Sequence, residues 1–174
     1  MGRIRRFLSD LGEDGVALIE FGLIGSAYIL MLVAAFEVGF MMFVQAALDN
    51  AARDAARQIR TGQVQTAGDP GTTFKTLLCN DVSNLIPCAS LIYQTKSFWN
   101  WSAAQSQIAA PMTRDKNGNL VGTGFDGGGS SGEIEVVQVT YNYPFFTPLI
   151  GSLLGGGTNS ALLVSTVVFQ NEPF

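Results

Sequence analysis

The sequence predicts an α+β protein in which a long N-terminal transmembrane helix extends into a small domain, where an antiparallel sheet packs on the helix. Three observations predict this fold. An almost uncharged apolar run near the N-terminus is long enough to cross a membrane, helical periodicity continues beyond it, and strand-like segments occupy the second half of the chain. A length of 174 residues leaves room for one membrane span and one modest domain.

The apolar run extends from Val16 to Phe36 and holds one charged residue, Glu20, in 21 positions. A helix needs about 20 mostly apolar residues to cross the hydrocarbon core of a bilayer, so the run has the length of a transmembrane helix. A charged side chain inside such a helix costs on the order of 3 kcal/mol, and less near an end. The carboxylate of Glu20 therefore requires a specific reason.

Residues 37–61 continue the helix as an amphipathic segment. Apolar residues recur there at spacings of three and four, which places them on one helix face. They are Met41, Val44, Leu48, Ala51, Ala55 and Ile59. Thr61 and Gly62 predict the end of the helix, because glycine favours the backbone conformation that closes a helix C-terminus. The apolar face predicts a covering layer over this half of the helix.

Residues 62–174 are expected to form the α+β domain. The glycine, aspartate and proline at positions 67–71 break the helix, and Thr72 or Thr73 is expected to cap a short helix that ends near Cys79.

Three later segments have the composition or alternation of strands. They are residues 91–98, 134–143 and 161–169. In the second of these, Val137 and Val139 fall on one face and Gln138 falls on the other. Residues 126–132, with four glycines and two serines, predict a flexible loop.

The arginines predict the orientation of the chain in a membrane. Three of them lie within the first six residues, and the next basic residue is Arg53. The positive-inside rule therefore places the N-terminus in the cytoplasm and the C-terminal domain in the periplasm of a bacterium, with the span in the inner membrane. Because the periplasm is oxidising, Cys79 and Cys88 are expected to form a disulfide.

Composition also argues against several functions. The net charge is −4, with no basic patch beyond the first six residues, which argues against a nucleic-acid partner. The chain contains no histidine, the commonest general base and metal ligand. We therefore expect no metal, cofactor or small-molecule substrate, and a structural role instead of an enzymatic one.

The segment Gly15-Val-Ala-Leu-Ile-Glu-Phe21 resembles a prepilin processing site, in which a short polar leader ends in glycine and glutamate is the fifth residue after the cut. The resemblance implies that residues 1–15 are a cytoplasmic leader and that a prepilin peptidase cuts between Gly15 and Val16. It also implies that Glu20 and Phe21 take part in subunit assembly. Glu20 would neutralise the new α-amino group of a neighbouring subunit.

The chain is similar, more narrowly, to the TadE-like family of minor prepilin-like proteins in the Tad (Flp, type IVb-like) pilus system. Three stretches carry this resemblance. The first is residues 15–21, the second is residues 36–39 with the alanine- and arginine-rich residues 45–57, and the third is residues 136–143, 147–149 and 169–174. The family implies a minor pilin or pilus assembly protein that initiates or caps a filament. Its partners would be the prepilin peptidase, other pilin-like subunits and the Tad assembly platform.

Two alternatives stay open at this point. Glu37 fits either an anchor at the level of the lipid headgroups or a contact with another subunit. The whole chain also fits an uncleaved bitopic anchor whose periplasmic domain binds an envelope partner or a glycan, through Trp99 and Trp101. The competing interpretation of these two tryptophans is a corner of the core or an aromatic belt near the membrane.

Overall fold

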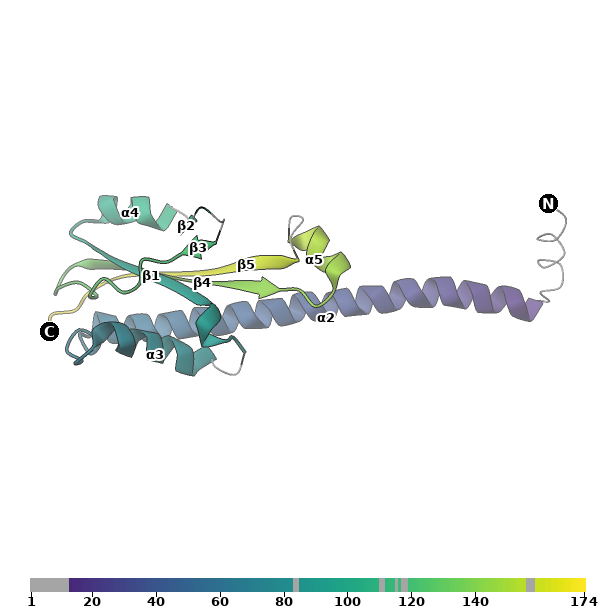
Figure 1. Ribbon diagram of the computed structural model, residues 1–174, viewed down its shortest axis with the longest axis horizontal. Coiled ribbons are helices and arrows are strands. Elements are labelled where there is room, and N and C mark those ends of the chain that lie inside the picture. The colour runs from purple at the N-terminus through teal and green to yellow at the C-terminus, as the bar shows by residue number, and fades with distance from the viewer. Residues whose placement is uncertain (1–12, 83–84, 110–111, 115, 117–118, 156–158) are drawn as a thin grey trace. The chain divides into compact units, whose positions relative to one another are not determined.

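A computed structural model describes residues 13–82, 85–109, 112–114, 116, 119–155 and 159–174. The chain divides into two compact units, Met1–Phe40 and Met41–Phe174. The described part of the first unit is helical, and the second unit combines helices with an antiparallel sheet (Figure 1). The predicted α+β class is confirmed.

Helix α2, Glu13–Arg60, carries the apolar run. From Gly15 to Phe36 none of its residues is buried, and the large apolar side chains of this stretch are exposed. Among the described residues, Gly15–Arg60 is the one helical stretch long and apolar enough to cross a membrane. This finding is compatible with a single-pass membrane protein.

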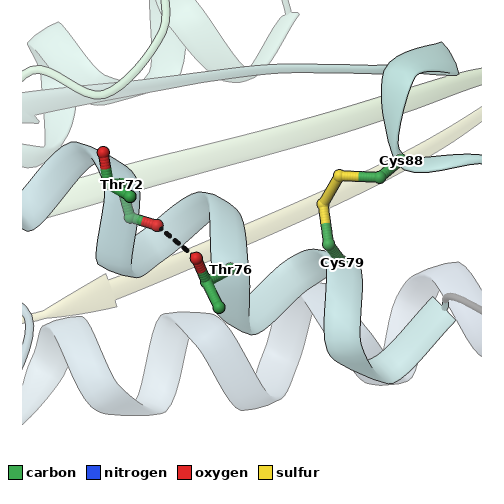
Figure 2. The surroundings of a disulfide bond; sticks show 4 residues. All are labelled: Thr72, Thr76, Cys79 and Cys88. Atoms are coloured by element: carbon green, nitrogen blue, oxygen red, sulfur yellow. Dashed lines mark hydrogen bonds between the residues drawn. A yellow bond between two sulfur atoms is a disulfide. The ribbon is translucent and has the colours of Figure 1, made fainter.

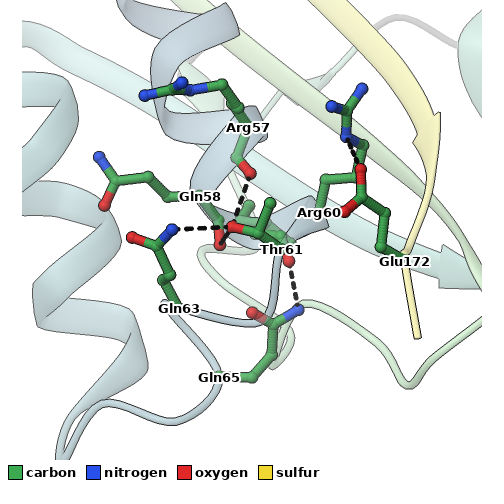
Figure 3. Close-up of polar contacts among 8 residues, drawn as sticks. Arg57, Gln58, Arg60, Thr61, Gln63, Gln65 and Glu172 are labelled. Carbon is green, nitrogen blue, oxygen red and sulfur yellow. Dashed lines mark hydrogen bonds and ion pairs between the residues drawn. The ribbon is translucent and has the colours of Figure 1, made fainter. Parts of the chain in front are cut away.

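Helix α2 ends as the sequence predicts, at Thr61 and Gly62. Gly62 adopts φ 77°, its N–H donates to Ile59 O at 2.9 Å, and the N–H of Gln63 donates to Gln58 O at 3.0 Å. This pair of bonds is a Schellman motif, which satisfies carbonyl groups left over at a helix end. Figure 3 shows further side-chain bonds here, including Gln63 Nε2 to Thr61 Oγ1 at 3.1 Å.

The C-terminal tail is fixed against this helix end. The N–H of Glu172 donates to Arg60 O at 2.9 Å, and Arg60 Nε lies 3.1 Å from Glu172 Oε1 (Figure 3). The ring of Phe174 occupies the space that a Cβ on Gly62 would need. Glycine is therefore required at position 62 both by its backbone conformation and by this contact.

The sheet of the second unit has three antiparallel strands in the order β1-β4-β5. The strands are β1 Leu91–Phe98, β4 Ile134–Pro144 and β5 Ser160–Gln170. Each overlaps a strand predicted from the sequence. Central strand β4 pairs Tyr141 with Leu91 on one side and with Leu163 on the other. From Ile134 to Tyr141 every residue of β4 is buried, so both faces of the sheet are covered.

One layer is formed by the part of α2 that belongs to the second unit. Its predicted apolar face is buried, apart from a half-buried Met41. Ala52 and Ala56 are buried as well, so the stripe is wider than the sequence pattern predicts. The extra width is explained by α3, Pro70–Val82, which lies along this part of α2 in Figures 1 and 2. Alanine permits close approach of two helices.

Helix α3 begins earlier than expected. The carboxylate of Asp69 accepts the N–H of Thr72 at 3.1 Å and its hydroxyl at 2.6 Å. The expectation that Thr72 or Thr73 caps this helix is therefore wrong, because aspartate caps it and Pro70 occupies its first turn. The bonds from Thr72 hold the pKa of Asp69 below its usual range.

The expected disulfide joins the far end of α3 to the next segment. Cys79 bonds to Cys88, the first residue of the 3₁₀ helix η1, Cys88–Ser90, with Cα atoms 5.3 Å apart. Figure 2 shows this bridge beside the hydrogen bond from Thr76 Oγ1 to Thr72 O at 2.8 Å. The bridge closes a short loop that leads directly into β1.

The opposite face of the sheet packs on α4, Trp101–Ala109. Ala104 contacts Ile134 and Val136 there, and Asn100 caps the helix by accepting the N–H of Ala103 at 2.8 Å. Three short elements were not predicted. They are the paired strands β2, Thr113–Arg114, and β3, Leu120–Val121, and helix α5, Pro148–Leu154.

Replacing Gly62 by alanine tests the closure of α2. A Cβ at this position must accept a left-handed backbone and displace Phe174, so we expect a loss of about 1–3 kcal/mol in the free energy of unfolding. Thermal unfolding of the detergent-solubilised chain measures it. Gly68→Ala is the matched control, because a Cβ there meets nothing within 4 Å. Equal melting temperatures for the two variants would contradict this account.

Candidate assembly site

The predicted cleavage site lies in α2. The described part of this helix starts at Glu13, and the peptide bond between Gly15 and Val16 is helical. Val16 is 51% exposed and Phe21 is 77% exposed. Among the described residues, side-chain packing therefore does not cover this peptide bond.

Glu20 lies one helical turn beyond Val16. Residues four apart share one side of a helix, so the carboxylate and the Val16 backbone face the same direction. Glu20 is exposed. No lysine or arginine occurs between Arg6 and Arg53, so this stretch of the chain offers the carboxylate no basic side chain. A cation from another molecule has open access to it.

Three small residues, Gly22, Gly25 and Ser26, lie on the side of α2 opposite Glu20. A Cβ on Gly22 would meet nothing within 4 Å, and one on Gly25 would meet only the ring of Phe21 at 3.9 Å. Ser26 satisfies its hydroxyl on its own helix, donating to Leu23 O at 3.0 Å. Small residues of this kind let a second helix approach closely within a membrane.

Glu37 behaves differently from its neighbours on α2. It is 6% exposed, whereas Phe36 immediately before it is 77% exposed. Little of the Glu37 side chain is therefore available to a second subunit. Its burial could not be inferred from the sequence, where it appears as the charge that ends the apolar run.

A comparison with known families finds one match within this helix. Residues 15–57 match the family model described as TadE-like protein. The match confirms the resemblance expected from the first two stretches, while the third stretch lies outside it. No curated protein and no solved structure shows a significant match to the chain. The TadE-like segment, residues 15–57, is helical throughout and ends one turn before α2 does.

A second group of charged residues lies in the sheet unit, around a loop expected to be flexible. Asp126 fixes this loop to β1, because its carboxylate accepts Thr95 Oγ1 at 2.9 Å and the N–H of Ser97 at 2.8 Å. Gly128 O accepts both Gln65 Nε2 at 2.9 Å and Asn171 Nδ2 at 2.7 Å.

The expectation of a flexible loop is therefore wrong. The glycines of residues 126–132 serve a fixed backbone with positive φ, which is 112° at Gly127, 78° at Gly128 and 68° at Gly129.

Glu135 is fully buried next to Asp126. Its Oε2 accepts Ser97 Oγ at 2.8 Å, while Oε1 has no hydrogen-bond partner among the described residues. Burial, and then the charge of Asp126, raises the pKa of Glu135 from 4.5 to about 8. The sequence contained the signal, since the alternation that places Val137 and Val139 on the core face places Glu135 there too. No metal-binding group of three or more acids, cysteines or histidines occurs among the described residues.

The buried Glu135 predicts a pH-dependent stability. The pKa of Glu135 is higher in the folded state than in the unfolded state. Its contribution to the free energy of unfolding is therefore fully present below about pH 4.5 and is lost as pH rises toward 8. Glu135→Gln cannot ionise and keeps the shape of the side chain. Between pH 5 and pH 8.5, we expect the free energy of unfolding of this variant to rise relative to that of the parent, by up to about 5 kcal/mol.

Denaturant unfolding at several pH values measures this difference. Glu172→Gln is the control, because Glu172 is exposed and its ion pair with Arg60 is worth little. A parent protein whose stability stays constant from pH 5 to 8.5 would contradict the assignment.

Proposed function

We propose that the chain is a minor pilin or assembly component of a Tad-type pilus, inserted once in the bacterial inner membrane with its sheet unit in the periplasm. The match of residues 15–57 to the TadE-like family carries this proposal. The long apolar helix and the disulfide between Cys79 and Cys88 support it.

The first step of the proposed mechanism is removal of the leader. A prepilin peptidase cuts between Gly15 and Val16 on the cytoplasmic side. The bond lies within the described helical part of α2, so the backbone must leave the helix locally to enter the peptidase active site. Glycine at position 15 assists, since it is about 1 kcal/mol less favourable in a helix than alanine.

The second step is assembly through charge neutralisation. The cut creates an α-ammonium group at Val16, and this cation meets Glu20 of a neighbouring subunit. The pairing removes the cost of holding an isolated carboxylate near lipid. The exposed Phe21 lies beside Glu20, and the small residues Gly22 and Gly25 on the opposite face of α2 let a further helix approach closely. The sheet unit then initiates or caps the filament.

Mass spectrometry of the membrane-extracted protein tests the first step. In cells that contain the prepilin peptidase, we expect a chain that begins at Val16 and lacks the first 15 residues. Cells without the peptidase, and a Gly15→Val variant in normal cells, are expected to keep the full-length chain.

A different outcome would favour the second candidate function, an uncut anchor with a binding domain. Trp99 and Trp101 are 82% and 57% exposed, so the interpretation of these residues as a core corner is wrong, and they are available to a glycan or an envelope partner. Full-length protein in both strains would remove the amine that Glu20 is proposed to meet.

Substitution of Glu20 tests the second step separately. Glu20→Gln removes the charge but not the cleavage site, so we expect normal processing and a decrease of about tenfold or more in the subunit recovered in sheared surface filaments. Glu20→Asp is the control that keeps the charge and is expected to recover part of this assembly. Normal filament recovery with glutamine would overturn the role given to Glu20.

A further inference from the structure

Two hydrogen bonds fix the direction of β5 within the second unit. Gln45 Nε2 donates to Val164 O at 3.1 Å, and the N–H of Glu172 donates to Arg60 O at 2.9 Å. Strand β5 therefore runs in the same direction as the part of α2 from Met41 to Arg60. Its first residues lie toward the Met41 end of this unit, and so does α5, which precedes them (Figure 1).

Helix α5 is held in one orientation. The N–H of Phe145 donates to Asn159 O at 3.0 Å, and Asn159 Nδ2 donates to Phe145 O at 2.9 Å, so the connection between β4 and β5 is closed at its base. Gly151 packs so closely against Asn159 that no Cβ would fit, and Ile150 is buried beneath the helix. The remaining face of α5 is thereby directed outward.

This outward face is apolar. It consists of Leu149, Leu153 and Leu154, with the preceding Phe146, and these side chains are 51–76% exposed. We call these four residues the α5 patch. Met42 and Phe43, at the same end of the unit, are exposed as well. An exposed group of this size and rigidity marks an interaction surface, unlike a single exposed leucine.

The chemistry of the surrounding sequence restricts the partner. From Val136 to Asn171 there is no charged residue in 36 positions, which excludes recognition of an acidic or basic surface by salt bridges from this segment. The Met41 end is also where the chain passes into the apolar run that ends at Phe36. If that run lies in a bilayer, chain continuity keeps this end close to the bilayer surface.

We infer that the α5 patch inserts into the lipid interface, as a second membrane contact in addition to the proposed transmembrane span. The helix has seven residues and is far too short to cross a bilayer, so it lies in the plane of the interface with its leucines in the acyl region. Its affinity comes from burial of apolar surface, and the tether through α2 removes most of the entropic cost of association. This inference depends on the membrane insertion proposed above.

The opposite end of the second unit provides an internal contrast. Phe98 pairs with Ile134, which pairs with Gln170, so β1 ends at the Arg60 end of the unit. Trp99 and Trp101 follow β1 directly and therefore lie at the end away from α5. They are exposed aromatic residues that the same reasoning keeps out of the lipid interface.

Site-specific fluorescence quenching tests the inference. The native cysteines are in a disulfide, so one added cysteine carries the label in each full-length variant: Leu153→Cys in the α5 patch, Trp101→Cys at the far end and Leu30→Cys in the apolar run. Each is reconstituted in phosphatidylcholine vesicles that contain a lipid with a nitroxide on an upper acyl carbon. We expect quenching at position 153 about threefold or more stronger than at position 101, and strong quenching at position 30.

The three labelled positions distinguish membrane insertion of the apolar run from the interfacial role of α5. Quenching at position 30 without quenching at 153 would overturn the interfacial role of α5 and leave membrane insertion intact. Absence of quenching at both would overturn insertion, and the inference with it. A label at 153 that is shielded from water but not quenched by the nitroxide lipid would identify a second copy of the chain as the occupant, and would likewise overturn the lipid contact.

Discussion

The structure depends most on the burial of one helix face. In the part of α2 that belongs to the second unit, the buried positions include four alanines, Ala51, Ala52, Ala55 and Ala56. Small side chains contribute little apolar area of their own, but they let neighbouring elements approach closely and pack larger residues between them. The elements that pack on this surface are strands β4 and β5 and helix α3. The disulfide at the end of α3 and the C-terminal tail at Gly62 then fix the two ends of the layer.

The sequence predicted the parts of this fold whose signals are local. Periodicity identified α2 and its buried face, and alternation or β-branched composition identified the three strands. Helix α5 was missed because its seven residues give too short a pattern, and its orientation depends on the contact of Gly151 with Asn159. The loop at residues 126–132 is held by hydrogen bonds, and it was wrongly predicted to be flexible for a related reason. Glycine-rich composition is the same for a mobile loop and for one with several positive φ angles, and only tertiary bonds distinguish them.

The candidate site likewise combines residues that local sequence signals predict with residues whose properties depend on tertiary contacts. Gly15, Val16 and Glu20 were predicted from the resemblance of residues 15–21 to a prepilin processing site, and this prediction needed nothing from the rest of the fold. The raised pKa of Glu135 arises from burial and from the charge of Asp126, a residue that is not part of its own strand. Glu135 was nevertheless accessible to simple reasoning, because a strand that alternates strictly cannot place Val137 inside without placing Glu135 inside as well.

The distribution of charge indicates why the sheet unit has two different ends. The Arg60 end holds the ion pair to Glu172, Asp126 with its bonded loop, and the exposed tryptophans. The other end holds the exposed apolar side chains of Met42, Phe43 and the α5 patch, with Asp81 lining a pocket beside Phe43. A domain surrounded by water on all sides gains nothing from such a segregation, because exposed leucines there only promote aggregation. A domain attached to a membrane through Met41 benefits, since its apolar end meets lipid while its polar and aromatic end faces water and any partner there.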